Sequence, residues 1–549
     1  MNKRYFACLL LGVLLSVPKG WAQGYSGHER LTNLPHLYIN TKTGLPITSK
    51  TDDVWAEMWL VDENDEVLYE DSLSIRGRGN STWGLPKKPY RIKFREKKKL
   101  LGGDRANAKK WTLLANHADK TLFRNALASY VGDLCGQPFT PAAKFVDFTL
   151  NGEYVGTYQI SDKIDVRKKR VNITEQDYPL TEESNITGGY LLEFDGFKDF
   201  TEGVDGFRSA RSRIPVRIHY PEDDEIDYRQ LDYISNYLNE VESRLFATNY
   251  MDKDLGYRAM VDSTSLVSWY LATEIVANPD CFWSLFLYKE ADNDHLFFGP
   301  MWDYDIAFGN DNRLADYTTT GSRWNQQKIL QANTERKLMA DYAFGNYETE
   351  EWIRRMWNDP WFQHLVFRNY VRLYRDGLKQ KIIDKIDDLA ELLDESQQLN
   401  YQRWSINTGY YNEVVLFSTY DEYVEDLKTY VSVHVDYLLE AFASRQPETV
   451  DLDEIINGET TPYDPSGVSH VFDDTPDYAL AYNSESHRLH FGADSPSDLD
   501  FTARVYDSSG REVLSFKASE GADVGFLRPG IYVVNWKSYG RSHSVKFIR

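Results

Sequence analysis

Short runs of alternating hydrophobic and polar residues fill the first part of the chain, as in LYINTK, EMWLVDEN, SLSIRGRG and YRIKF. Such alternation between turn residues predicts half-buried strands. WTLLANHADKTLFRNALASYVGDLCG then has helical spacing, and FVDFTLNGEYVGTYQISDKID predicts a hairpin that turns at Asn151-Gly152. We therefore predict a β-rich part over about residues 30–200.

Helical periodicity dominates the next part of the chain. Residues 227–247 and 262–277 carry apolar side chains one helical turn apart, and residues 349–444 combine charged faces with apolar stripes. Between them, SLFLYKE and HLFFGPMWDYD predict two strands joined by a turn at 291–294. We predict a helical part over about 225–445 and an α+β fold class for the region 23–445.

The composition changes after residue 445. Residues 446–477 are acidic and rich in Pro, Gly and Thr, which is typical of a linker. Residues 478–549 contain about seven short strand patterns, so we predict a small C-terminal β-sandwich.

The first 22 residues have the pattern of a secretory signal peptide. A basic start precedes an apolar run over Phe6–Val17, and Trp21-Ala22-Gln23 predicts cleavage after Ala22. The apolar run is too short to span a bilayer, and no later stretch predicts a transmembrane helix. We expect a secreted, periplasmic or cell-surface protein, in which Cys135 and Cys281 either form one disulfide or stay as two buried thiols.

The charge balance singles out one basic stretch in an acidic chain. The chain has 62 Lys+Arg against 84 Asp+Glu, a formal net charge of -22, which disfavours nucleic-acid binding. Against this background RGRGNSTWGLPKKPYRIKF (76–94) is strongly basic. Lys88 lies at the entrance of a predicted strand, and Lys93 lies on it. A rigidly held lysine can position a phosphate, but a solvated edge strand would show the same pattern.

Three carboxylates are expected to meet in the second half of the chain. Asp280 follows the helix over 262–277, and Asp303 and Asp305 lie where the second predicted strand ends. An antiparallel hairpin would bring Asp280 close to Asp303. Asp303 and Asp305 would point to the same face of an extended segment. Such a group suits a divalent cation or a division of metal-binding and proton-accepting roles, whereas each residue alone is equally typical of a cap or turn.

These segments, taken in order, resemble the spore coat protein H (CotH) kinase family. RGRGNSTWGLPKKPYRIKF, WTLLANHADKTLFRNALA, NGEYVGTYQISDKID, GGYLLEFD, the NPD loop and GPMWDYDIAFGN carry the resemblance over about residues 35–310, and more loosely to about 445. It implies a divergent protein-kinase-like core with an added helical region. It also implies a Mg²⁺-dependent (or Mn²⁺-dependent) transfer of phosphate from ATP to serine or threonine of an extracytoplasmic protein.

The resemblance also implies roles for individual residues. Asp280 matches the catalytic-loop aspartate and Asp303 the metal-binding aspartate, with Asp305 beside it. A lysine of PKKPYRIKF, Lys93 or Lys88, matches the nucleotide-contacting lysine, and Arg78 and Arg124 are further candidates for the phosphates. For Arg124, a structural salt bridge is an equally good interpretation.

Two departures from the family pattern favour a second hypothesis. Ser284 occupies the region where many members carry an asparagine metal ligand, and Asp162 stands where the family has glutamate. The alternative function is therefore a catalytically inactive surface binding or structural protein. The tail, with RVYDSSGREVLSF and FLRPGIYVVNWKSYGRSHSVKFIR, is similar to C-terminal sorting domains of secreted Gram-negative surface proteins, which implies attachment to the cell surface. An accessory carbohydrate- or protein-binding sandwich would share this pattern.

Overall fold

The computed structural model describes residues 28–311, 338–341, 348–410, 413, 416–447 and 450–457, and in the C-terminal part 480–483, 487–491, 502–507, 511–528, 530–538 and 541–548. The predicted signal peptide and most of the predicted linker lie outside these residues. The chain divides into two compact units, 1–459 and 460–549. Among the helices described, none has the length and apolar character needed to cross a membrane.

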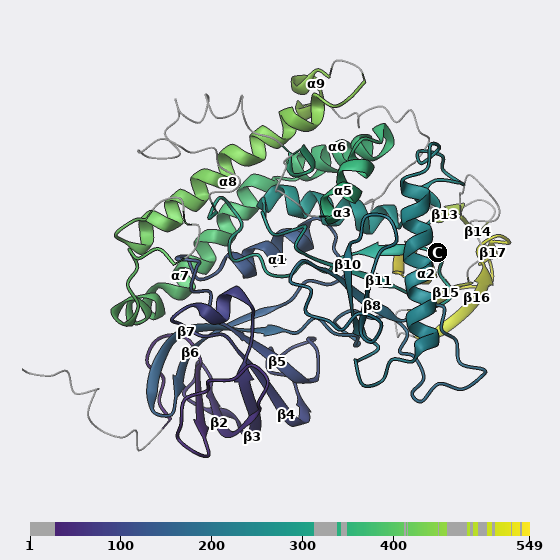
Figure 1. Cartoon of the computed structure of the whole chain (residues 1–549). Helices are drawn as coiled ribbons and strands as arrows, with labels where there is room; N and C mark the ends of the chain where they lie inside the picture. Colours follow the sequence, from purple (N-terminus) through teal and green to yellow (C-terminus); the bar gives the residue numbers. More distant parts are fainter. Residues whose placement is uncertain are drawn as a thin grey trace, which may run out of the picture. The chain divides into compact units, whose positions relative to one another are not determined.

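A closed seven-stranded barrel forms the first part of the larger unit (Figure 1). Its strands follow the order β1-β2-β3-β4-β5-β7-β6, and a parallel pairing of β1 with β6 closes it. The strands are β1 (His36–Thr41), β2 (Val54–Val61), β3 (Val67–Gly77), β4 (Tyr90–Lys98), β5 (Ala108–Leu114), β6 (Ala143–Leu150) and β7 (Glu153–Asp162). Alternate residues of each strand, such as Ile75, Ile92 and Phe94, fill the interior.

A five-stranded sheet in the order β12-β11-β8-β10-β9 forms the second part. Its strands are β8 (Tyr190–Asp195), β9 (Gly206–Arg208), β10 (Pro215–Tyr220), β11 (Ser284–Lys289) and β12 (Leu296–Phe298). The antiparallel pairing of β11 with β12 confirms the hairpin expected from SLFLYKE and HLFFGPMWDYD, although β12 already ends at Phe298, before Asp303. The turn between β6 and β7 also has the predicted residues, with left-handed backbone at Asn151 (φ 52°) and Gly152 (φ 79°).

Helices pack beside both sheets. They are α1 (Arg124–Leu134), α2 (Tyr228–Leu245), α3 (Ser263–Val276), α5 (Glu348–Trp357), α6 (Pro360–Arg375), α7 (Leu378–Arg403), α8 (Tyr420–Ala443) and α9 (Leu452–Asn457). Asp262 caps α3 by accepting a hydrogen bond from the Ser265 backbone N–H (2.7 Å). Helix α7 is fastened to the barrel by buried polar contacts, such as the 2.6 Å hydrogen bond between Thr157 of β7 and Ser396.

The smaller unit contains two sheets that share one hydrophobic core. Leu489 and Phe491 of the first sheet belong to the same buried cluster as Val505 and Trp536 of the second. The first sheet has the order β13-β14-β17 and the second β16-β15-β18-β19. The strands are β13 (Leu480–Asn483), β14 (Arg488–Phe491), β15 (Thr502–Asp507), β16 (Glu512–Lys517), β17 (Ala522–Asp523), β18 (Ile531–Ser538) and β19 (Arg541–Ile548).

The two cysteines are both buried and are not joined in a disulfide. Of the two arrangements that the sequence left open, the structure therefore has the pair of thiols. Burial also raises the pKa of the Cys135 thiol far above its usual range, so this thiol stays protonated and unreactive at neutral pH.

Candidate active site

A cleft of about 460 Å³ lies between the barrel and the five-stranded sheet. This volume is in the range of small-molecule binding sites. The barrel side contributes mainly cations, namely Lys50, Arg76, Arg78, Arg91 and Lys163. The sheet side contributes Glu193, Asp195, Arg217, His219, Ser284 and Phe286, and Asp303 also lines the cleft. Basic side chains therefore dominate one wall, and most of the carboxylates belong to the other.

Arg78 faces the carboxylates from the turn after β3. Its guanidinium lies over the Trp302 ring, 5.2 Å from the centroid. Burial lowers the pKa of Arg78, and the negative charges of Asp303 and Asp305 oppose that shift. The next residue, Gly79, has φ +84°, and a Cβ there would lie 2.2 Å from the Thr82 hydroxyl oxygen. Glycine is therefore required to turn the chain and place Arg78 at the cleft.

Neighbouring strands of the sheet place a glutamate, a histidine and a serine together on the cleft wall. The register pairs Glu193 of β8 with Arg217 of β10 and with Phe286 of β11, so all three project to one face. His219 Nε2 lies 2.6 Å from Glu193 Oε2, and the Ser284 hydroxyl donates to the other carboxylate oxygen. Burial opposes ionisation of Glu193, but these two hydrogen bonds hold its pKa below the usual value.

Asp280, Asp303 and Asp305 interact electrostatically where the sequence predicts their convergence. Burial raises the pKa of Asp303, and the charge of Asp280 raises it further, whereas Arg78 opposes the shift. Burial also raises the pKa of Asp305 well above its usual range, and the charge of Asp303 adds to this. Asp303 keeps solvent contact in the cleft although protein surrounds it, while Asp305 is 8% exposed.

The expectation that Asp303 and Asp305 share one face of an extended segment is wrong. Asp303 has left-handed backbone (φ 68°), and the segment turns immediately after it. As a result only Asp303 lines the large cleft, while both carboxylates border a smaller cavity behind it. Asn278, two residues before Asp280, donates through its side-chain amide to the Asp303 carbonyl (3.3 Å) and so fastens the two loops together.

The donor chemistry of this region fits a magnesium ion. Carboxylates that repel one another, as Asp303 and Asp305 do, are stabilised in their charged form by a divalent cation. No three acidic, imidazole or thiol groups among the described residues converge on one point as a complete metal cage. Mg²⁺ does not require one, because it commonly takes one or two carboxylates and completes its shell with phosphate oxygens and water.

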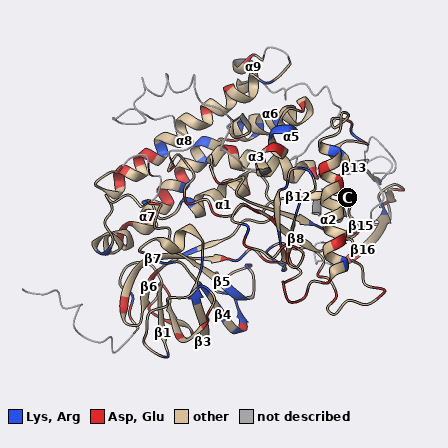
Figure 2. Ribbon diagram, viewed as in Figure 1, with Lys and Arg blue, Asp and Glu red and all other residues tan. Residues whose placement is uncertain are grey.

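Three of the predicted phosphate-binding cations do not line the cleft. The Lys88 ammonium donates to the Trp83 carbonyl (2.7 Å) and lies over the Trp83 indole. Lys93 is exposed on β4, among the cations of that strand (Figure 2). Arg124 is 1% exposed and forms a buried ion pair with Asp119. Of the four predicted cations, only Arg78 lies at the cleft.

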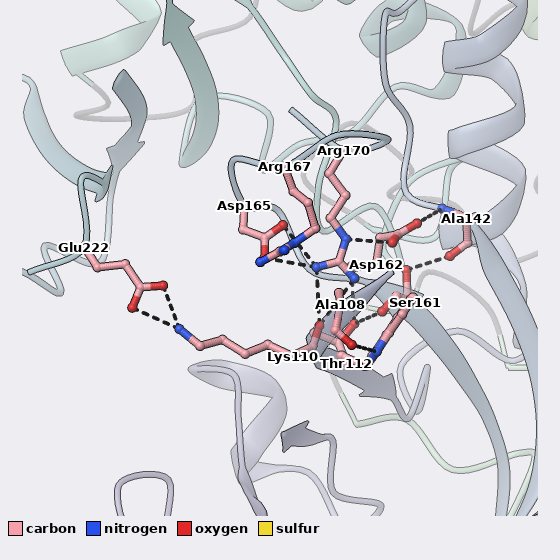
Figure 3. A network of polar contacts seen from close by, with 11 residues as sticks. Ala108, Lys110, Thr112, Ala142, Ser161, Asp162, Asp165, Arg167, Arg170 and Glu222 are labelled. Atoms are coloured by element: carbon pink, nitrogen blue, oxygen red, sulfur yellow. Dashed lines mark hydrogen bonds and ion pairs between the residues drawn. The ribbon is translucent and has the colours of Figure 1, made fainter. Parts of the chain in front are cut away.

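Asp162, which replaces the family glutamate, is bound to an arginine (Figure 3). Arg170 Nε donates to Asp162 (2.8 Å), and its Nη1 donates to Asp165 (3.0 Å). The backbone N–H of Ala142 also donates to Asp162 (3.2 Å). This buried network holds the end of β7 and leaves Asp162 paired with Arg170 rather than with a lysine.

Lys163 and His219 are among the cleft residues that sequence reasoning missed. Alternation in SDKID places Lys163 on the opposite face from the buried Asp162 and Ile164, so that signal was present in the pattern. No comparable signal marked His219, because its place opposite Glu193 depends on the register of β10 against β8.

One comparison with known protein families identifies the family of this chain. No curated protein matches the chain. The model of the CotH kinase protein family matches residues 75–438, which include the end of β3, the barrel strands β4 to β7, the five-stranded sheet, the helices α1 to α7 and most of α8. This match covers more than half of the chain, and the protein therefore belongs to the CotH kinase family.

Proposed function

We propose that this protein is an atypical protein kinase that transfers the γ-phosphate of ATP to serine or threonine hydroxyls of extracytoplasmic proteins. The observation that carries the proposal is the cleft itself. Arg78 and other cations line its barrel wall, while Glu193, Asp195 and Asp303 lie across from them. The phosphate chain of ATP requires cationic side chains, and the metal ion bound to it requires carboxylates close by. Family membership supports the same function.

Each acidic or basic group has a specific task in this proposal. Arg78 would bind phosphate oxygens and offset the negative charge that moves during transfer. Asp280 would accept a hydrogen bond from the acceptor hydroxyl, orient it toward the γ-phosphorus and receive its proton. Because positioning and charge neutralisation supply most of the rate enhancement in phosphoryl transfer, these few side chains suffice.

Asp303, with Asp305 behind it, would hold Mg²⁺ or Mn²⁺. When bound, the cation would neutralise charge on the β- and γ-phosphates. Asn278 fixes the Asp303 backbone through its amide, and the Asp303 carboxylate is open to the cleft. In this proposal the barrel and the five-stranded sheet with its helices correspond to the two lobes of a kinase-like core.

The second candidate function is a binding protein that keeps the fold without turnover. Ser284 at the position of the family asparagine favours it, because its hydroxyl is already bound to Glu193. The pairing of Asp162 with Arg170 favours it as well, because this carboxylate does not orient a lysine. Under either function, we propose an exported protein that the C-terminal unit attaches to the cell surface.

A transfer assay separates the two candidates. The purified chain is incubated with labelled ATP, Mg²⁺ or Mn²⁺ and serine-rich acceptor proteins, in parallel with Asp280→Ala and Asp303→Ala. We expect label on the acceptor with the wild-type protein and a loss of at least about 100-fold in both variants. Asp388→Ala on the exposed face of α7 is the matched control and should keep full activity. Equal labelling by wild type, Asp280→Ala and Asp303→Ala would eliminate the kinase.

A melting experiment tests the binding step alone. A ligand that binds only the native state raises the melting temperature. We expect ATP with Mg²⁺ to raise it for wild type and to raise it less for Asp303→Asn. A higher melting temperature with ATP but no phosphate transfer in the first assay would favour the binding protein. An unchanged melting temperature with ATP and either metal would argue against a nucleotide site.

A further inference from the structure

Lys163 presents a half-buried ammonium group to the cleft from the end of β7. It directly follows Asp162, which pairs with Trp111 of β5 in the barrel. Asp162 and Ile164 on either side of it are 1% and 4% exposed, so the backbone at this point is fixed. Within the part of the chain that the structure describes, the Lys163 ammonium has no hydrogen bond and no ion pair.

The carboxylates beside Lys163 in the sequence are occupied by another cation. Asp162 and Asp165 both accept hydrogen bonds from Arg170, at 2.8 and 3.0 Å (Figure 3). Arg170 is completely buried between them and is further held by the Lys110 carbonyl (3.3 Å). The carboxylates of Asp162 and Asp165 therefore already have Arg170 as their cationic partner, and neither forms an ion pair with Lys163.

The Glu222 carboxylate, which acts electrostatically on Lys163, is occupied as well. Glu222, just after β10, accepts hydrogen bonds from the Lys110 ammonium at 2.7 and 3.0 Å (Figure 3). The charges that face Lys163 are therefore those of Lys110 on β5, Arg91 on β4, Asp165 and Glu222. Burial lowers the pKa of Lys163 to about 8, and the positive charge of Lys110 adds to this shift, which Asp165 and Glu222 only partly oppose.

Three other cations of the cleft differ from Lys163 in this respect. Lys50 donates to the Gly79 carbonyl (2.9 Å). Arg91 donates to Asp53 (2.7 Å), and Arg217 donates to Asp199 (3.0 Å). Each of these side chains therefore already has a protein acceptor.

Arg78 resembles Lys163, because its guanidinium has an aromatic contact with Trp302 but no ion pair among the described residues. Arg78, just after β3, and Lys163, just after β7, are thus two cleft-lining cations that form no ion pair within the described residues. Two partly desolvated cations of this kind favour an anionic ligand, because its charge replaces the hydration that they lose on burial.

We propose that Lys163 binds the phosphate chain of the nucleotide together with Arg78. This inference rests on the proposed function and assigns the phosphate-contacting lysine to β7 rather than to the basic stretch 76–94. A linear polyphosphate fits better than a single carboxylate. It can span two cations in a cleft of about 460 Å³ and still leave oxygens for a metal beside Asp303.

Binding measurements with ATP and with inorganic tripolyphosphate, both with Mg²⁺, test the inference. We expect Lys163→Met to weaken the binding of both ligands by about 10- to 100-fold, because the variant loses one charge-assisted hydrogen bond to a phosphate oxygen. The matched control is Lys93→Met, because Lys93 is an exposed lysine on β4 that does not line the cleft; it should change affinity less than about twofold. Unchanged thermal unfolding of ligand-free Lys163→Met would show that the fold is intact.

The pH dependence of binding provides a second readout that a structural role would not produce. Because the ammonium form binds phosphate, wild-type affinity should fall as the pH rises through about 8, while Lys163→Arg should keep its affinity to about pH 9.5. Equal pH profiles for the two proteins would overturn the inference.

The two ligands distinguish failure of the inference from failure of the proposed function. If wild type binds ATP and Lys163→Met binds it equally well, the inference is wrong and the kinase stands. If tripolyphosphate binds in a Lys163-dependent way but ATP does not, the kinase is wrong and the phosphate contact stands. If an acidic peptide competes as well as tripolyphosphate, or neither ligand binds, the assignment of Lys163 to a phosphate is refuted.

Discussion

Replacing Arg170 by methionine tests the buried network that holds the end of β7. Arg170 is completely buried, donates to Asp162 and Asp165, and lies over the Trp111 ring at 4.6 Å. Methionine keeps much of the apolar stem and removes the charge together with its hydrogen bonds. Asp162, 1% exposed, would then be a buried carboxylate with only the Ala142 N–H as its donor.

The expected loss follows from breaking one side of a buried ion pair, which costs about 3–5 kcal/mol. Burial already raises the pKa of Asp162, and Arg170 opposes that shift, so Arg170→Met would raise the pKa further. Between the unfolded value of 3.8 and the raised folded value, the folded protein binds a proton that the unfolded chain does not. Stability of the variant therefore falls as pH rises through this window, and its deficit is larger at pH 7 than near pH 4.

Urea unfolding followed by tryptophan fluorescence at pH 7 and pH 4.5 measures both effects. Adding Asp162→Asn to Arg170→Met should recover part of the lost stability, because a neutral amide replaces the uncompensated charge. The control is Arg403→Met, which removes a solvent-exposed pair with Glu153 and should cost at most about 1 kcal/mol. If Arg170→Met costs no more than that control, or the double variant is the less stable one, the buried-pair reasoning is wrong.

Other sites give further expectations. Gly77→Ala would place a Cβ 2.3 Å from the Trp83 ring, so we expect a loss of about 1–3 kcal/mol and weaker nucleotide binding, measured by thermal unfolding with and without ATP. Lys87→Met would leave the buried Asn400 amide oxygen with only the Thr157 backbone N–H (3.2 Å) as donor, in place of that donor and the Lys87 ammonium (2.9 Å), and should cost about 1–3 kcal/mol in urea. Because burial lowers the pKa of Lys87 well below 10.5, wild type should also gain stability as pH rises toward that value, and the methionine variant should not. Burial lowers the pKa of His117 to about 3, so wild type should lose stability as pH falls from 6.5 toward 3, and His117→Gln should reduce that loss in acid titrations followed by circular dichroism.

Local sequence patterns were sufficient where local physics decides the structure. Period-2 alternation in residues 90–94 predicts a strand with Ile92 and Phe94 on one face, and both side chains are buried in the barrel. Helical spacing predicts the helix over 262–277, which is α3, and the structure shows Asp262 as its N-cap. The strand–turn–strand pattern that follows predicts the pairing of β11 with β12, and with it the electrostatic contact between Asp280 and Asp303.

Which cations reach the cleft could not be derived in that way. Lys93 and Lys163 are the same type of residue and both lie on or beside barrel strands, yet only Lys163 lines the cleft. The same holds for Arg124, whose partner Asp119 is close in sequence but whose burial depends on the surrounding helices. Nor does a sequence pattern show that Asp162 is held by Arg170 or that Asp303 has left-handed backbone.

By itself, then, the sequence determined the order and type of the elements, their buried faces, the family motifs and the hairpin that joins two aspartates. The tertiary structure alone decided the opposed walls of the cleft and the exposure of Lys163 and Arg78 to it. The physical reason is that hydrophobic periodicity acts between residues a few positions apart. The charge environment of a side chain, in contrast, depends on strand register, on barrel closure and on which neighbour has already taken the available partner.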